Sequence, residues 1–214
     1  TFGLLQVGTK LAGFVASLAR PGGNITGFSI LAEGLSAKRL EILREIDPRI
    51  SRVAVLRNLA IPTHGVLLKD TETAARALRM TLVPLDYRNA GDLQEVLKSL
   101  TRERADGLVV LPDATTSAKR TLIASVASQS GLPAMYPWAG FVDAGGLAAY
   151  GPNPNDLWRR SATYVDRILK GARPADLPIE QPTRFELVVN LKVAKTLRLT
   201  IPQTVLLRAD RVIE

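Results

Sequence analysis

The chain has 214 residues, of which 46% are hydrophobic and 22% are charged, a composition that predicts a globular protein with a substantial core. The absence of cysteine excludes disulfides, cysteine nucleophiles and cysteine-based zinc sites. The net charge of +8 is spread over segments of mixed sign such as KRLEILREID, whereas a nucleic-acid-binding surface needs a basic stripe or aromatic platforms.

Strands and helices alternate along the middle of the chain. Helical spacing of apolar residues or helix-forming composition predicts helices over 35–47, 63–80, 91–106 and 117–131, the last ended by Gly131. Short apolar runs between them predict strands at 52–58, 81–87, 107–113 and 132–136. Because these strands are continuously apolar, they favour a parallel sheet that helices cover on both faces.

The two ends of the chain differ from this regular middle. Residues 25–30 and 184–190 are strand-like, and DLWRRSATYVDRILKG at 156–171 is a clear helix. Neither end forms a complete α/β domain alone, so we expect the two ends to pack together. The sequence therefore predicts one lobe from residues 36–139 and a second, discontinuous lobe from 1–35 plus 140–214. We expect the chain to cross between these lobes near 29–36 and near 143–150.

Four stretches carry a resemblance to a known family. These are SLARPGGNITGFS, SAKRLEILREIDPRISRVAVLRN, RERADGLVVLPD and ATYVDRILKGARPADLPIEQPTRFELVVNLKVAKTLRLTIP. They resemble the ABC transporter substrate-binding protein family, and the similarity covers essentially the whole chain. The resemblance implies a two-lobed type I periplasmic-binding-protein fold, α/β in class, with a doubly wound, mainly parallel sheet in each lobe. Because family members carry a further α/β segment before the position of Thr1, we expect the N-terminal lobe to be incomplete here.

The resemblance also implies a function and partners. We expect an extracytoplasmic or periplasmic protein, not an enzyme, that captures a small polar solute such as an amino acid between its lobes and delivers it to a membrane permease. Contact with a membrane is then expected only through the permease or a lost lipid anchor, and we expect an export signal outside this sequence. A homodimer formed through the incomplete lobe is a further expectation. The alternative is a ligand-sensing domain of a regulator or receptor.

Three candidate solute contacts follow strands of the middle segment. Asn58 ends the run RVAVLRN, where its amide can donate to a carboxylate and accept from an amine. Asp113 follows GLVVLP, where its carboxylate can pair with a ligand ammonium, and Thr115 lies in the loop after it. The alternative for Asn58 is a cap on its own turn, and the alternative for Asp113 is the N-cap of the next helix.

Two aromatic residues and a serine complete the expected site. One of Tyr136 and Trp138, in MYPWAG, is expected to stack on the solute while the other only covers the core, and Tyr136 is the preferred wall of the site. Tyr150, in GGLAAYGPN, lies where the chain returns between lobes and is expected to face the solute, with packing at the crossover as the alternative. Ser29 lies on the opposite crossover and is the weakest of these candidates.

Catalytic and cofactor motifs are absent from the sequence. His64 is the only histidine, and a lone histidine without a paired acid and hydroxyl more often lies in a solvated loop than in a catalytic site. GGNITG precedes a strand and lacks the GxGxxG order, so it does not predict dinucleotide binding. We therefore expect no metal and no cofactor.

Overall fold

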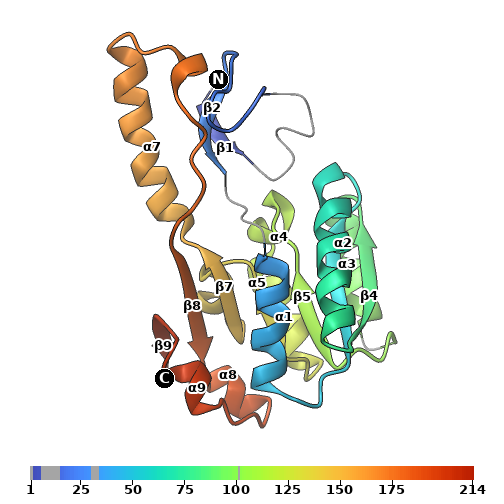
Figure 1. Ribbon diagram of the computed structural model, residues 1–214. Coiled ribbons are helices and arrows are strands. Elements are labelled where there is room, and N and C mark those ends of the chain that lie inside the picture. Colours follow the sequence, from blue (N-terminus) through green and yellow to red (C-terminus); the bar gives the residue numbers. More distant parts are fainter. Residues whose placement is uncertain (1, 6–14, 30–33, 101) are drawn as a thin grey trace. The chain divides into compact units, whose positions relative to one another are not determined.

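The structure is a computed structural model that describes residues 2–5, 15–29, 34–100 and 102–214 (Figure 1). The chain divides into two compact units. The smaller unit consists of Thr1–Glu33 and Pro152–Phe185, and the larger unit consists of Gly34–Gly151 and Glu186–Glu214. Among the described residues, no helix has the length and apolar character required to cross a membrane.

The larger unit is built on a seven-stranded sheet with the strand order β4-β3-β5-β6-β7-β8-β9. The pairings of β4 with β3, β3 with β5, β5 with β6, β6 with β7 and β8 with β9 are all parallel. The strands are β3 (Arg52–Asn58), β4 (Thr81–Tyr87), β5 (Gly107–Val110), β6 (Ala134–Tyr136), β7 (Ala148–Pro152), β8 (Phe185–Asn190) and β9 (Arg211–Ile213). This sheet confirms the predicted mainly parallel α/β class.

Helices connect these strands along the chain. They are α1 (Leu35–Ile46), α2 (Pro62–Ala77), α3 (Ala90–Ser99), α4 (Ala114–Ala118), α5 (Arg120–Gln129), α6 (Gly140–Asp143), α8 (Leu191–Thr196) and α9 (Gln203–Leu206). Local sequence sets several of their ends. The Asn89 side chain accepts hydrogen bonds from two backbone N–H groups at the start of α3. Gly131 takes a left-handed conformation just after α5, which confirms the predicted stop.

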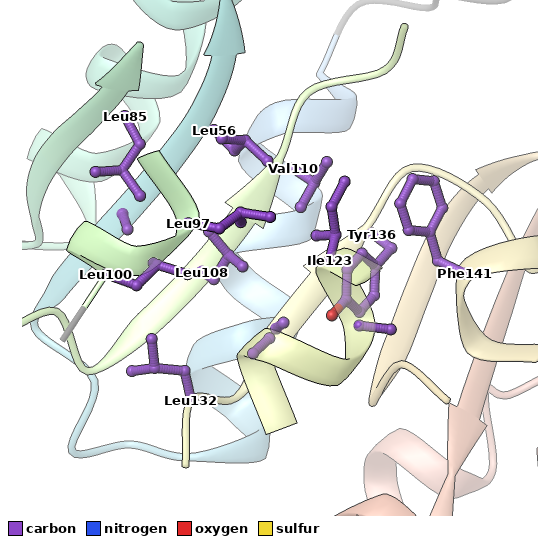
Figure 2. Packing of buried hydrophobic residues seen from close by; sticks show 14 of the residues in the cluster. Leu56, Leu85, Leu97, Leu100, Leu108, Val110, Ile123, Leu132, Tyr136 and Phe141 are labelled. Atoms are coloured by element: carbon purple, nitrogen blue, oxygen red, sulfur yellow. The ribbon is translucent and has the colours of Figure 1, made fainter. Parts of the chain in front are cut away.

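Alternating strand residues separate the core of the larger unit into two layers. Ala54 and Leu56 pack with residues of α3 and α5 on one face of the sheet, part of which Figure 2 shows. Val53 packs with residues of α1, α2, α8 and α9 on the other face. Helices therefore cover both faces, which explains why the strands lack the alternating polar pattern of a half-exposed sheet.

The smaller unit joins the N-terminal segment to residues 152–185. In the N-terminal segment, β1 (Phe2–Leu5) pairs in parallel with β2 (Thr26–Ser29). The later segment contains α7 (Pro154–Leu169) and the 3₁₀ helix η1 (Pro174–Asp176). The core contains Phe28, Leu157, Tyr164 and Leu177. The Thr26 hydroxyl donates to the Leu177 carbonyl at 2.8 Å, so a hydrogen bond joins segments about 150 residues apart in sequence.

The division of the chain differs from the expected one at three places. Residues 34–35, 140–151 and 186–214, expected in the discontinuous lobe, belong to the larger unit. The physical reason is sheet pairing, because β8 lies beside β7 and β9 pairs with β8 in the seven-stranded sheet. The first expected crossover, near 29–36, includes residues 30–33, which lie outside the described residues.

Candidate functional site

The candidate site lies at the carboxyl ends of the parallel strands in the larger unit. The chain runs from β3 outward to β4 and then returns to place β5 on the other side of β3, so the strand order reverses between β3 and β5. In open α/β sheets, ligands bind beyond the carboxyl ends of the strands at such a reversal. Asn58 is the last residue of β3, and Asp113 lies three residues after the end of β5. The topology therefore brings these two predicted residues to the same edge.

Asp113 is the N-cap of α4 and is only 2% exposed. Its Oδ1 accepts from the Thr116 backbone N–H at 2.6 Å, while the Asp113 backbone N–H donates to the Thr116 hydroxyl at 3.1 Å. This reciprocal pair is a capping box. The sequence-based alternative, a helix cap, is thus a role that Asp113 fills in the structure, with Thr116 as the other member of the capping box.

Tyr87, at the end of β4, is a member of the site that was not predicted from the sequence. Its hydroxyl donates to Asp113 Oδ2 and forms a second hydrogen bond with the Asn58 side chain. Burial, and then the neighbouring Asp113 carboxylate, raise the pKa of the Tyr87 hydroxyl well above its usual value. Tyr87 therefore stays neutral and remains a hydrogen-bond donor to Asp113. The sequence could have indicated Tyr87 by its position, since Tyr87 ends a predicted strand as Asn58 does.

Asn58 is 5% exposed, and its side chain serves two local partners. Its Oδ1 accepts from the Ala60 backbone N–H at 2.9 Å, which is the predicted alternative of an asparagine capping its own turn. Because Oδ1 accepts and the Tyr87 hydroxyl already donates to Asp113, the Asn58 amide nitrogen is the donor to Tyr87. A chain of hydrogen bonds thus runs from Asn58 of β3 through Tyr87 of β4 to Asp113, three residues after β5.

His64 belongs to this edge, although a solvated loop was expected for it. It lies in the first turn of α2 and is 1% exposed. Its Nδ1 lies 2.9 Å from the backbone nitrogen of Asn58, and its Nε2 lies 3.2 Å from the carbonyl oxygen of Pro112. Burial is the main reason that the pKa of His64 lies below its usual value. The imidazole therefore links the end of β3 to the segment that follows β5.

Two threonines lie close to these residues in the sequence. Thr115 is half-buried in α4, two residues after the cap formed by Asp113. Thr63 precedes His64 in α2, and its buried hydroxyl has no hydrogen-bond partner within the described part of the chain. A buried hydroxyl without a partner is unusual in a folded protein, which makes Thr63 a residue of interest at the start of α2.

Tyr136 lies in the hydrophobic core and not on an open wall. The residue is 1% exposed, and its ring stacks on Phe141 with ring centroids 5.0 Å apart, as Figure 2 shows. Burial raises the pKa of its hydroxyl. The structure therefore favours the sequence-based alternative of core packing, because Tyr136 is the last residue of the buried strand β6 and packs against Phe141 of α6.

Tyr150 is half-buried in β7 and packs against the core layer that contains α1. Its carbonyl oxygen accepts a hydrogen bond of 2.8 Å from Nε of Arg39, and Nη2 of Arg39 lies 3.4 Å from the carbonyl oxygen of Pro137. Arg39 is almost completely buried, and this burial lowers its pKa to about 10. The backbone of Tyr150 is thus held from α1, which agrees with the expected alternative of packing at the crossover.

Ser29 lies in the smaller unit, at the end of β2. It is buried, and its backbone N–H donates to the Glu180 carbonyl at 2.8 Å. The structure therefore places Asn58, Asp113 and the newly found Tyr87 and His64 together, while Ser29 belongs to the other compact unit.

The chemistry available at the carboxyl edge is hydrogen bonding. It offers a carboxylate, an amide, hydroxyls and a neutral imidazole. Within the ranges that the structure describes, no group of three or more His, Asp or Glu side chains is arranged to hold a metal ion.

Comparison with known proteins gives relatives of similar fold. A domain from Streptococcus pneumonia, solved in complex with L-Trp, is 25% identical with a TM-score of 0.87, over 96% of this chain and 70% of that chain. A conserved domain protein from Vibrio cholerae is 26% identical with a TM-score of 0.88, over 95% and 68% of the two chains. Both likenesses support the type I periplasmic-binding-protein-like fold.

A curated sequence relative is the "Tyrosine-binding protein" of Clostridioides difficile, which is 24% identical over 187 residues. The match covers 87% of this chain and 53% of the relative, so the chain spans about half the length of that protein. The family described as "ABC transporter substrate binding protein" matches residues 6–213. Its members are binding proteins and not enzymes. The chain belongs to the ABC transporter substrate-binding protein family.

Proposed function

We propose that the protein captures a small polar solute of the amino-acid class, with an aromatic amino acid as the best candidate, and delivers it to the permease of an ABC importer. The observation that carries this proposal is the buried polar network of Asn58, Tyr87 and Asp113 at the reversal of strand order. The names of two relatives, one binding tyrosine and one solved with L-Trp, support the choice of ligand.

The residues at this edge complement the two charged groups of an amino acid. Each oxygen of Asp113 accepts one hydrogen bond within the protein, and a carboxylate oxygen can accept a second one from a solute ammonium. The unpartnered hydroxyl of Thr63 can donate to a solute carboxylate. Thr115 and Tyr150 remain candidate contacts in this proposal, Ser29 is a weaker one, and Tyr136 supports the site from the core.

The proposed importer role implies a location and partners. A solute-binding protein of an importer acts outside the cytoplasm and presents its solute to a membrane permease, so we place this chain in the periplasm or another extracytoplasmic compartment. We retain a second copy of the chain as a proposed partner, with α7 as the contact surface. Trp158, Val165 and Leu169 recur on α7 at helical spacing and are exposed. Sedimentation at increasing concentration tests this pairing, which Trp158→Lys should weaken.

The solute class can be tested with four related compounds. L-tyrosine and L-tryptophan carry both charged groups, tyramine lacks the carboxylate, and 3-(4-hydroxyphenyl)propionate lacks the amine. We expect the two amino acids to raise the thermal midpoint of the chain and to release or absorb heat in calorimetry, and the two analogues to bind much more weakly. Bound ligand stabilises a fold by about 2.7 kcal/mol at a concentration one hundred times its Kd.

A pair of matched variants locates the site. Asp113→Asn removes the charge that would meet the solute ammonium, and we expect it to weaken amino-acid binding by at least tenfold. Asp106→Asn makes the same change at the amino end of β5, where Asp106 accepts hydrogen bonds from Ser51 and Arg52, and we expect no change in solute affinity. Equal effects of the two variants, or no binding of any amino acid across a broad library, would contradict the proposed function.

A further inference from the structure

His64 is a buried titratable residue that the proposed solute contacts do not use. Its ring lies between two segments that carry candidate contacts, because Nδ1 faces the Asn58 backbone and Nε2 faces the Pro112 carbonyl. Asn58 ends β3, and Pro112 directly precedes Asp113 after β5. The imidazole is thus a direct side-chain link across the point where the strand order reverses.

The two hydrogen bonds fix the proton on one nitrogen. The Asn58 backbone N–H can only donate, so Nδ1 of His64 must accept and carries no proton. The Pro112 carbonyl can only accept, so Nε2 carries the proton and donates it. Both bonds therefore exist together only in the neutral ring with its proton on Nε2. A second proton would place an N–H group on Nδ1 directly against the N–H group of Asn58.

We propose that His64 is a positioning residue for solute binding, whose neutral ring holds the ends of β3 and β5 in register and whose protonation releases Asn58 and lowers solute affinity. This inference rests on the proposed function for its last step only. Its first step, the dependence of the Asn58 position on the charge of His64, concerns the protein without any solute.

Charged groups from three elements influence this proton. Asp113, after β5, favours the protonated ring, whereas Arg57, on β3, disfavours it. Arg57 is itself paired with Asp86 of β4, which partly neutralises its charge. Tyr87 faces Asp113 as a neutral donor and adds no charge. Burial of the ring acts in the same direction as Arg57, and together they keep His64 neutral at pH 7.

The first arm of the test uses nuclear magnetic resonance on the full chain without solute. Because His64 is the only histidine, its two ring nitrogens give one pair of signals that need no further assignment. We expect signals of the ring protonated on Nε2 at neutral pH, and a shift of the Asn58 amide that follows the same titration as the ring at acidic pH. Hydrogen exchange of the Asn58 amide, corrected for its intrinsic pH dependence, should lose protection in the same range.

The second arm measures the affinity for L-tyrosine and L-tryptophan on both sides of the His64 titration midpoint that the first arm gives, at pH values where an α-carboxyl and an α-amino group keep their charges. We expect the Kd of the wild-type chain to rise as the pH falls through this midpoint, approaching tenfold per pH unit below it. His64→Asn keeps an acceptor for the Asn58 N–H, and His64→Gln keeps a donor for the Pro112 carbonyl. Neither side chain titrates, so the Kd of both variants should be independent of pH.

The two arms separate the possible failures. If no amino acid binds at any pH, the proposed function fails, and the spectra of the solute-free chain still decide whether His64 positions Asn58. An Asn58 amide that ignores the titration of His64 overturns the inference whether or not a solute binds. A wild-type Kd that does not change with pH, or a slope that persists in His64→Gln, also overturns it. If the variants fold poorly, the titrations of the wild-type chain are sufficient to support or overturn the inference.

Discussion

A Cβ atom placed on Gly151 would lie 2.0 Å from the carbonyl oxygen of Pro137. The end of β7 therefore passes the segment after β6 at a distance that only glycine allows. The same Cβ atom would lie 3.1 Å from Nη2 of Arg39, whose guanidinium donates to the carbonyl of Tyr150. The glycine in the sequence AAYGP thus permits a close backbone approach, and a substitution there would push against backbone that has little room to move.

We expect Gly151→Ala to lower the free energy of unfolding by about 3 kcal/mol or more, because the added methyl group collides with a backbone oxygen. Gly65→Ala is the matched control. Gly65 lies within α2, and a Cβ atom on it would meet nothing within 4 Å. Alanine favours a helix over glycine by about 1 kcal/mol, so the control should be neutral or more stable. Urea titration of both variants measures the difference, and equal stability would contradict the close approach.

The hydrogen bond from Tyr87 to Asp113 should be visible as a coupling free energy. We expect Tyr87→Phe to destabilise the fold by about 2 kcal/mol, because a buried carboxylate loses a donor, and Asp113→Ala to cost about 3 kcal/mol through loss of the cap and of that bond. The double variant should cost about 1 to 2 kcal/mol less than the sum. Tyr87→Phe combined with Asp106→Ala, at the opposite end of β5, should be additive.

Stability should fall on mild acidification because of His64. The unfolded ring titrates near 6.5, whereas burial lowers the pKa of the folded ring. Below pH 6.5 the His64 ring binds a proton in the unfolded chain but not in the folded chain. The free energy of unfolding therefore decreases as the pH falls, until the pH reaches the pKa of His64 in the folded chain. The slope is at most about 1.4 kcal/mol per pH unit. His64→Asn should remove this dependence of the free energy of unfolding on pH. Constant stability of the wild-type chain between pH 6.5 and 5 would contradict the prediction.

A second acidic transition should come from another residue at lower pH. A hydrogen bond from Arg49 lowers the pKa of Asp47 below 3.8. The stabilisation by this pair is therefore present above that pH and is lost as the pH falls through the folded pKa. Arg49→Gln should remove the pH-dependent part of the stability that comes from Asp47 and leave the part that comes from His64 unchanged. Denaturant titrations at closely spaced pH values separate the two ranges.

The placement of Tyr136 in the core predicts how its variants behave. We expect Tyr136→Phe to keep the affinity for L-tyrosine unchanged, since it preserves the ring that stacks on Phe141. Tyr136→Ala should cost about 3 to 5 kcal/mol of stability, because it leaves a cavity in a well-packed layer. A Tyr136→Phe variant that stays fully stable and loses solute binding would contradict this placement and assign the Tyr136 hydroxyl to the solute.

The element types were predictable because they depend on local patterns. The strands 52–58 and 81–87 have the predicted bounds, since an apolar run between a helix end and a turn contains that information itself. Membership of a sheet does not depend on local pattern. FELVVN at 185–190 reads as a buried strand in either unit, and only its position beside β7 assigns it to the larger one.

The shared edge of Asn58 and Asp113 was predictable, because both residues end or follow a buried strand. Their contact with a solute stays a prediction. The roles of Tyr87 and His64 depend on contacts among three strand ends and the start of α2. The spacing of residues along the sequence does not indicate these contacts. His64 was expected in a loop because a single histidine gives no pattern, whereas its backbone partners are six and forty-eight residues away.

The mutual hydrogen bonding of Asn58, Tyr87, Asp113 and His64 has a consequence for selectivity. These groups already hold one another, so a bound solute would add contacts to an ordered surface and would order few side chains itself. An analogue that lacks a matching polar group would leave a desolvated partner unsatisfied, whereas an extra methylene would cost far less. Such an edge should therefore discriminate among solutes by the groups they lack more strongly than by the groups they add.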